Sequence, residues 1–149
     1  MNNNQKNIDT NNLQLASMKS RVKAFVIDDL SITLIVIIIL WDQISASNGD
    51  LIATMTVMNE AFLQIMILKF VYQTFFIWYY GATIGKLISK IRVIDFNNYG
   101  KVSFLNAAVR SFGRIVSEAV FYIGFILAYY GDSRQTFHDR FGKTLVVDA

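Results

Sequence analysis

Residues 21–41 read RVKAFVIDDLSITLIVIIILW, and this stretch decides what kind of protein the chain can form. Between Ala24 and Trp41 it is apolar apart from Asp28, Asp29 and two hydroxyl residues. As a helix this segment would be about 27 Å long, close to the thickness of the hydrocarbon core of a bilayer. Basic residues precede it and a tryptophan ends it, as at the two interfaces of a membrane span. The stretch predicts a transmembrane helix, and the alternative is a buried core helix of a soluble protein.

The composition of the whole chain favours the membrane interpretation. Of its 149 residues, 54% are hydrophobic and only 17% are charged, whereas soluble domains have about 25% charged residues. The mean hydropathy is +0.38. The chain contains no cysteine, which excludes a disulfide framework and a cysteine metal site. These values argue against a disordered chain and against a water-soluble enzyme.

Two further apolar segments follow the first. The second predicted span is Val57–Tyr80, which ends in an aromatic cluster typical of a membrane interface. A short loop, 42–57, is expected to join the two spans. Residues 1–17 are rich in asparagine and are predicted to form a disordered tail. The remainder, 18–149, is expected to form one membrane domain.

The distribution of basic residues predicts the orientation of the chain. Loop 42–57 has no lysine or arginine, whereas 81–114 has six basic residues and one acid. Because basic loops stay in the cytoplasm, we expect the N-terminus and 81–114 to be cytoplasmic. The position of this basic stretch after an aromatic belt favours anionic lipid head groups over nucleic acid as its partner.

The third apolar segment, 115–130, is too short for a comfortable span. We favour a partly re-entrant helical hairpin with arms Asn106–Glu118 and Phe121–Tyr130 over a single crossing. Two runs rich in β-branched residues, 91–95 and 144–148, are expected to pair in a small cytoplasmic sheet. A returning strand at 101–104 and a helix capped by Ser103 are further expectations. The predicted fold is therefore mainly α, with two transmembrane helices, a third apolar helix or hairpin, and a small cytoplasmic β-sheet.

Four motifs in fixed order carry a resemblance to a known family. They are Arg21 to Asp28, Gly81 to Lys86, Ile91 to Asp95, and Arg134 to Arg140 followed by Gly142. This combination resembles the RDD family of small bacterial multi-pass membrane proteins, named for an arginine and two aspartates.

The resemblance assigns the family arginine to Arg21 and the first aspartate to Asp28. Asp139 and Asp95 are both candidates for the second. Ile84 stands where the family commonly has proline, and Gly131 where an aromatic residue is more usual; neither departure removes a named position. The resemblance implies the bacterial cytoplasmic membrane and suggests transport, including cation/proton exchange.

Charged residues within the apolar helices are the main functional candidates, since charge at membrane depth is costly. Arg21 is expected to contact lipid phosphates. Asp28 and Asp29 point about 100° apart and are expected to reach different helices. Lys69 is expected near the depth of Asp28, and the two form either an acid–base pair along an ion path or a packed ion pair. Glu118 is a candidate for facing a polar cavity.

The remaining candidates lie near the cytoplasmic side. We expect Arg21, Asp28, Asp95 and Asp139 to form one polar cluster there. A lone histidine, His138, cannot make a zinc site without other ligands. No nucleophile motif is present, so we expect no enzyme, no cofactor and no metal.

Two functions follow from the sequence. The first is transport of a cation, a proton or a small solute past the intramembrane acids, for which so thin a bundle would need to form a homo-oligomer. The second is a non-transporting assembly factor, anchor or accessory subunit that binds another membrane protein.

Overall fold

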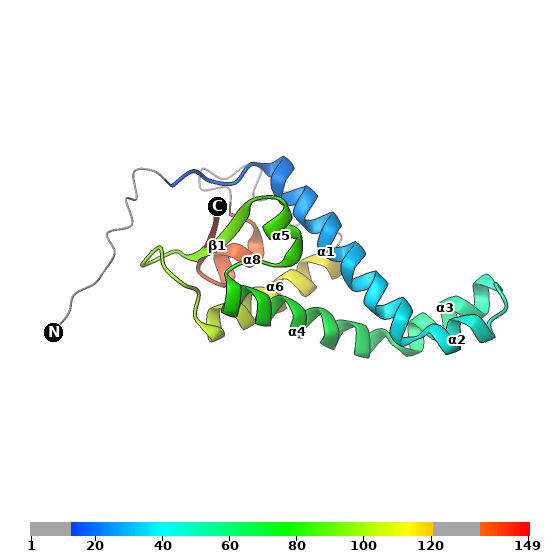
Figure 1. The fold of residues 1–149 in the computed structure, drawn as a ribbon. Helices are drawn as coiled ribbons and strands as arrows, with labels where there is room; N and C mark the ends of the chain where they lie inside the picture. The colour runs from blue at the N-terminus through cyan, green and yellow to red at the C-terminus, as the bar shows by residue number, and fades with distance from the viewer. Residues whose placement is uncertain (1–12, 121–134) are drawn as a thin grey trace.

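Two long helices, α1 (Met18–Ile39) and α4 (Phe62–Tyr80), frame the molecule. In the computed structural model, which describes residues 13–120 and 135–149, they lie close at one end and diverge towards the other. Figure 1 shows the shorter elements gathered at the wide end between them. These elements are α5 (Ile84–Ile88), β1 (Ile91–Asp95), α6 (Phe104–Ala119), α8 (Phe137–Phe141) and β2 (Thr144–Asp148).

Over its first half, helix α1 buries two charged residues and exposes several apolar ones. Arg21, Ala24 and Asp28 face the interior, whereas Val22 and Val26 are about half exposed. A soluble helix has the opposite arrangement, because its apolar stripe faces the core. The pattern suits a helix whose outer face meets lipid and whose inner face meets polar partners.

The predicted loop between the first two spans is wrong. Residues 41–60 are mostly helical, forming α2 (Trp41–Ala46) and α3 (Leu51–Glu60). The Asp50 side chain accepts a hydrogen bond from the Ile52 amide and so caps α3. The predicted second span, Val57–Tyr80, is accordingly divided at Ala61, where α3 ends and α4 begins.

Among the described residues, α4 is the one helix long and apolar enough to cross a membrane. Only four of its 19 residues are buried, and Leu63, Ile67 and Val71 are exposed, which is unlike a core helix of a soluble protein. The predicted first span corresponds to α1, which carries several charges and does not meet the same criterion.

The predicted pairing of 91–95 with 144–148 is confirmed. The strands are antiparallel, with Val93 opposite Val146. The chain just before α1 extends this sheet, since Leu15 bridges Val147 and the Ala16 amide donates to the Val146 carbonyl. The predicted tail 1–17 is therefore wrong for its last residues; 1–12 lie outside the described residues.

The segment after β1 contains a turn and a helix, and no strand forms at 101–104. The helix is α6, and the Ser103 side chain accepts a hydrogen bond from the Asn106 amide at its start. This confirms Ser103 as the N-terminal cap. Helix α6 corresponds to the first predicted arm and packs along α4. The second predicted arm, Phe121–Tyr130, lies outside the described residues, as do Gly124 and Gly131.

A small apolar core holds the wide end together. It joins the sheet to α1, α4 and α6. Its buried members are Ala16, Ala24, Ile77, Ile91, Val93, Val102, Ala107 and Val146. Most of these side chains are small, so the elements approach closely and bring the polar side chains beside them into contact.

Candidate functional site

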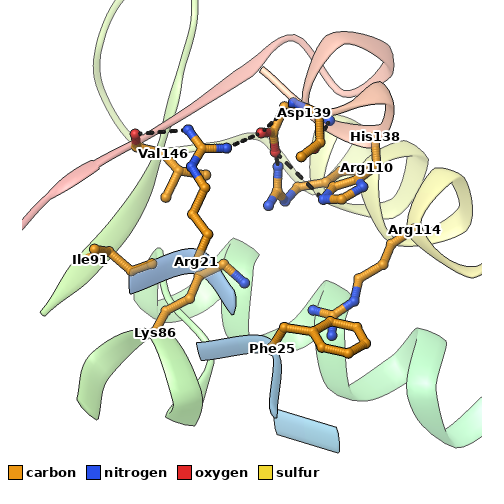
Figure 2. Close-up of a pocket in the computed structure, with 10 residues that line it drawn as sticks. Arg21, Phe25, Lys86, Ile91, Arg110, Arg114, His138, Asp139 and Val146 are labelled. Atoms are coloured by element: carbon orange, nitrogen blue, oxygen red, sulfur yellow. Dashed lines mark hydrogen bonds and ion pairs between the residues drawn. The ribbon is translucent and has the colours of Figure 1, made fainter. Parts of the chain in front are cut away.

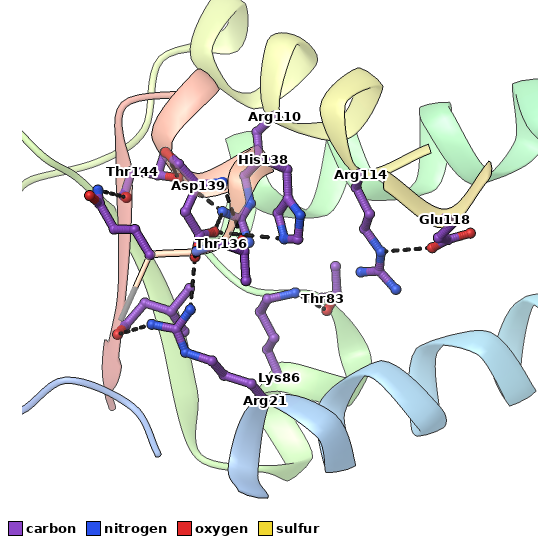
Figure 3. Close-up of polar contacts among 12 residues, drawn as sticks. Arg21, Thr83, Lys86, Arg110, Arg114, Glu118, Thr136, His138, Asp139 and Thr144 are labelled. Atoms are coloured by element: carbon purple, nitrogen blue, oxygen red, sulfur yellow. Dashed lines mark hydrogen bonds and ion pairs between the residues drawn. The ribbon is translucent and has the colours of Figure 1, made fainter. Parts of the chain in front are cut away.

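Two arginines hold the carboxylate of Asp139 in the interior. Arg21 from α1 donates to Oδ2 at 2.8 Å, and Arg110 from α6 binds Oδ1. Arg21 also donates to the Val146 carbonyl of β2 at 3.4 Å. Figure 3 shows these side chains converging from different elements. The buried carboxylate of Asp139 therefore connects α1 to α6, and Arg21 extends this connection to the sheet.

The local sequence places Asp139 at the start of α8. Thr136 caps this helix by accepting from the Asp139 amide, and Asp139 accepts in return from the Thr136 amide at 3.1 Å. A carboxylate at this position also meets the positive end of the helix dipole. Burial alone would raise the pKa of Asp139, but Arg110 and Arg21 hold it well below its usual range. The group is thus a permanent anion.

Asp28 is fully buried and accepts three short hydrogen bonds. Oδ1 accepts from the Tyr72 hydroxyl at 2.9 Å and from the Gly85 amide at 2.8 Å, and Oδ2 accepts from the Thr83 hydroxyl at 2.6 Å. Thr83 is the residue that precedes α5. The carboxylate on α1 therefore caps α5 from outside, as Asp139 caps α8 from within.

A cavity lies beside Asp139 (Figure 2), and its wall includes Lys86 and Arg114, the two cations nearest to Asp28. It leaves about 20 Å³ for the centre of a water-sized group. Four basic side chains form most of its polar wall: Arg21, Lys86, Arg110 and Arg114. His138, Asp139 and Thr136 complete the polar wall. Burial lowers the pKa of His138 well below its ordinary value, and the nearby Arg110 lowers it further. His138 is thus neutral at pH 7.

Lys86 is the cavity group whose protonation changes near neutral pH. Its Nζ lies 3.4 Å from the Thr83 hydroxyl and 3.9 Å from Asp28 Oδ2. Burial and the Arg114 charge lower the pKa of Lys86 from its ordinary 10.5 to about 7, against the opposing pull of Asp28. The side chain is only 6% exposed, so water screens these charges poorly.

Arg114 links the cavity to a second charged group deeper along α4. Its Nη1 lies 3.9 Å from Asp28 Oδ2, and its Nε donates to Glu118 at 3.1 Å. Glu118 in turn accepts from Lys69 at 3.0 Å, and Lys69 donates to Asp29 at 3.3 Å. The ion pairs therefore continue from the cavity to the middle of α4.

These contacts correct two sequence-based expectations. The predicted pair of Lys69 with Asp28 is wrong, because Lys69 lies against Asp29 and Glu118 while Asp28 turns to α5. Arg21 does not face lipid phosphates, because it is 6% exposed and bound to Asp139. The expectation that Asp28 and Asp29 reach different helices holds in part, because both contact α4, through Tyr72 and Lys69, and only Asp28 also binds the start of α5. Glu118 binds Lys69 and Arg114 beside a small recess.

The predicted four-residue cytoplasmic cluster forms in part. Arg21 and Asp139 are bonded directly, and Asp28 lies across the cavity wall from them. Asp95 is not among them, because it binds the amides of Asn97 and Asn98 in the turn after β1. Of the two candidates for the second aspartate, Asp139 is thus the one in contact with Arg21. Within the described ranges, no group of histidine and carboxylate residues is arranged to hold a metal ion.

Sequence reasoning missed most of the cations and hydroxyls that complete the site. Arg110 and Arg114 belong to the basic stretch expected to face lipid, yet they lie on the buried face of α6. A signal for this was present, since Ala107, Ser111 and Ser117 share that face and Phe112 lies opposite. A helix with small and basic residues on one face and aromatics on the other predicts a polar interior when lipid surrounds it.

Stability should rise with pH because of Lys86. The unfolded chain keeps this proton until about pH 10.5, whereas the folded chain releases it near pH 7. Between these values the unfolded state binds more protons, so the free energy of unfolding increases by up to about 1.4 kcal/mol per pH unit. We expect the detergent-solubilised protein to have a higher Tm at pH 9 than at pH 7. Lys86→Met should remove most of this rise, whereas the exposed variant Lys23→Met should keep it; equal profiles for wild type and Lys86→Met would contradict the assignment.

Comparison with known proteins identifies one family. The sequence profile of the RDD family matches residues 15–143, which contain Arg21, Asp28 and Asp139. No curated protein and no solved structure matches the chain. The family and the apolar helix α4 together indicate a membrane protein. Since the match covers most of its length, this chain belongs to the RDD family.

Proposed function

We propose that this protein is a small multi-pass transporter of the bacterial cytoplasmic membrane that moves protons or a small cation along its internal charged groups. The observation that carries the proposal is the presence of two groups of buried ion pairs that both contribute basic side chains to the cavity. In one, Asp139 binds Arg21 and Arg110 beside the sheet. The other runs from Asp28 through Arg114, Glu118 and Lys69 to Asp29 on the exposed flank of α1.

The energetics of these ion pairs favour a functional role. Each charge within an apolar helix costs free energy even when paired, and an apolar side chain of similar volume is often at least as stable in its place. Asp29 is the clearest case, because its side chain is 45% exposed and its bond to Lys69 is 3.3 Å long. Such a pair adds little to folding, so holding the fold together does not account for it.

The proposal includes an orientation and partners. The N-terminus, the sheet and the 81–114 stretch are cytoplasmic, where the exposed basic residues Lys90, Arg92 and Lys101 meet anionic lipid head groups. One copy has too few helices to enclose a pathway of its own, and a homo-oligomer would supply the missing wall. The proposed activity needs no cofactor, no enzyme chemistry and no nucleic acid.

A second function, a non-transporting anchor or accessory subunit that binds another membrane protein, is favoured by a different observation. Asp28 and Asp139 have their oxygens engaged by donors from neighbouring elements. Carboxylates held in this way stabilise a fold and have little freedom to exchange a cation. Measurement of flux separates the two functions.

The flux experiment uses Asp29→Asn in proteoliposomes of phosphatidylethanolamine and phosphatidylglycerol. Imposed Na⁺, K⁺ and proton gradients are followed with a pH-sensitive dye. We expect wild-type flux, and a loss of about tenfold or more in Asp29→Asn, equivalent to about 1.4 kcal/mol at one step of the pathway. The variant should remain folded because Asp29 makes a single long contact.

The matched control is Asp42→Asn, which removes an exposed carboxylate of α2. Its flux should equal that of the wild type. If the wild type dissipates none of the gradients, or if folded Asp29→Asn transports normally, the pathway is wrong and the accessory function takes its place.

A further inference from the structure

We propose that the cavity between Lys86, Arg110 and Arg114 binds a small monovalent inorganic anion of the size of chloride. This proposal concerns occupancy of a site and stands independently of any transport. Neither the family match nor the ion pairs assign a ligand to the cavity.

The charge on the cavity wall is the first argument. Four basic side chains line it, whereas Asp139 is its one carboxylate among the described residues. All of these groups are buried, so solvent ions do not neutralise them. Asp139 is already shared by Arg21 and Arg110. Arg114 is paired with Glu118, so a mobile anion would chiefly balance Lys86, whose nearest carboxylate oxygen is 3.9 Å away.

The hydrogen bonding of Lys86 is the second argument. An ammonium group has three donors, yet among the described residues its one hydrogen bond is the 3.4 Å contact with Thr83. The nearest carboxylate oxygen, Asp28 Oδ2, is 3.9 Å away, too far for a hydrogen bond. A buried cation with so few acceptors is costly, which points to an acceptor occupying the space in front of it.

Asp28 is oriented by other donors, and its Oδ2 atom stands 3.9 Å from Lys86. It already accepts from Tyr72, Thr83 and Gly85 at 2.6–2.9 Å. Arg114 Nη1 stops at the same distance as Lys86, 3.9 Å from Oδ2. Two cations thus stand back from one carboxylate, and Figure 2 shows the ends of both at the edge of the cavity.

The size of the cavity and its apolar wall bear on the class of anion. About 20 Å³ is open to the centre of a water-sized group, and one water needs about 10–15 Å³ by this measure. A single chloride ion fits this space. Phe25 and Ile91 form the apolar part of the wall, which further favours a weakly hydrated monovalent ion.

The test compares chloride with gluconate at constant ionic strength on the full-length protein in detergent. We expect the ³⁵Cl NMR line to broaden in the presence of protein and the Tm to rise saturably with chloride, because a ligand that binds only the folded state stabilises it. Bromide should act like chloride, while gluconate, which is too large, should not. Equal Tm in chloride and gluconate with no broadening means that the cavity holds water, and a response to phosphate but not chloride also overturns the proposal.

Two variants locate the site. Lys86→Met should weaken chloride binding by about tenfold or more, since a buried charge partner is lost. Lys23→Met makes the same change at an exposed position of α1 and should bind as the wild type does. If both variants retain the wild-type response, the site is elsewhere. If Lys86→Met does not fold, anomalous scattering from wild-type crystals in bromide decides, since the proposal requires a peak beside Lys86 Nζ.

Discussion

Asp139→Asn is expected to destabilise the protein by about 3–5 kcal/mol, the usual result of removing one partner from a buried ion pair. The substitution keeps the shape of the side chain but leaves Arg21 and Arg110 without their shared anion. The amide nitrogen of the new side chain is a donor, and it would face another donor: either a guanidinium group or the Thr136 amide, both of which now donate to the carboxylate. The contacts that join α1, α6 and α8 would weaken together.

The measurement is thermal unfolding in detergent, followed by the fluorescence of Trp41 and Trp78. The Tm should fall by about 10 °C or more, whereas Asp42→Asn on the exposed face of α2 should leave it unchanged. Arg21→Met should cost much less in the Asp139→Asn background than in the wild type, since its partner is already lost. Additive effects of these two substitutions would show that the pair is not coupled as the distances indicate.

The sequence predicted the parts of this fold that depend on local pattern. The pairing of 91–95 with 144–148, the cap at Ser103 and the second apolar helix all follow from residue type and spacing. The helices at 41–60 were not predicted, because this segment was assigned as the short connection between two spans. The absence of basic residues indicates which side of a membrane a segment occupies, but it does not distinguish a helix from a loop.

The partners of the buried charges could not be predicted in the same way. Lys69 and Asp28 were placed at a similar depth, but depth does not fix the rotation of a helix about its axis. The side chain of Asp28 turns to α5 because the Thr83 hydroxyl and Gly85 amide offer it short hydrogen bonds there. These donors lie at the start of α5, a five-residue helix whose position depends on the whole fold. The spacing of charges along α1 therefore could not predict that Asp28 binds them.

Close contact between α1 and α5 explains why glycine occupies position 85. A Cβ atom built there would lie 2.1 Å from the Ala24 carbonyl oxygen and 2.9 Å from the Asp28 carboxyl carbon. The Ala24 carbonyl belongs to the backbone, so a change of side-chain rotamer cannot relieve this contact. The absence of a side chain is what allows the Gly85 amide to approach Asp28 to 2.8 Å.

Gly85→Ala is therefore expected to separate α1 from α5 and to destabilise the fold by several kcal/mol, roughly 3 or more, because overpacking and loss of a buried hydrogen bond act together. The control is Gly100→Ala, where the added Cβ meets only the Asn98 side chain at 3.2 Å. We expect a large fall in Tm for Gly85→Ala and a small change for Gly100→Ala.

Gly85→Ala should also expose Lys86, because α5 carries that side chain and moves as one short helix. Accessibility of Lys86 to an amine-reactive reagent, read by mass spectrometry on folded protein at low temperature, would rise with the separation. A Gly85→Ala protein with wild-type Tm and a protected Lys86 would contradict the close contact of α1 with α5 and the hydrogen bond from the Gly85 amide to Asp28.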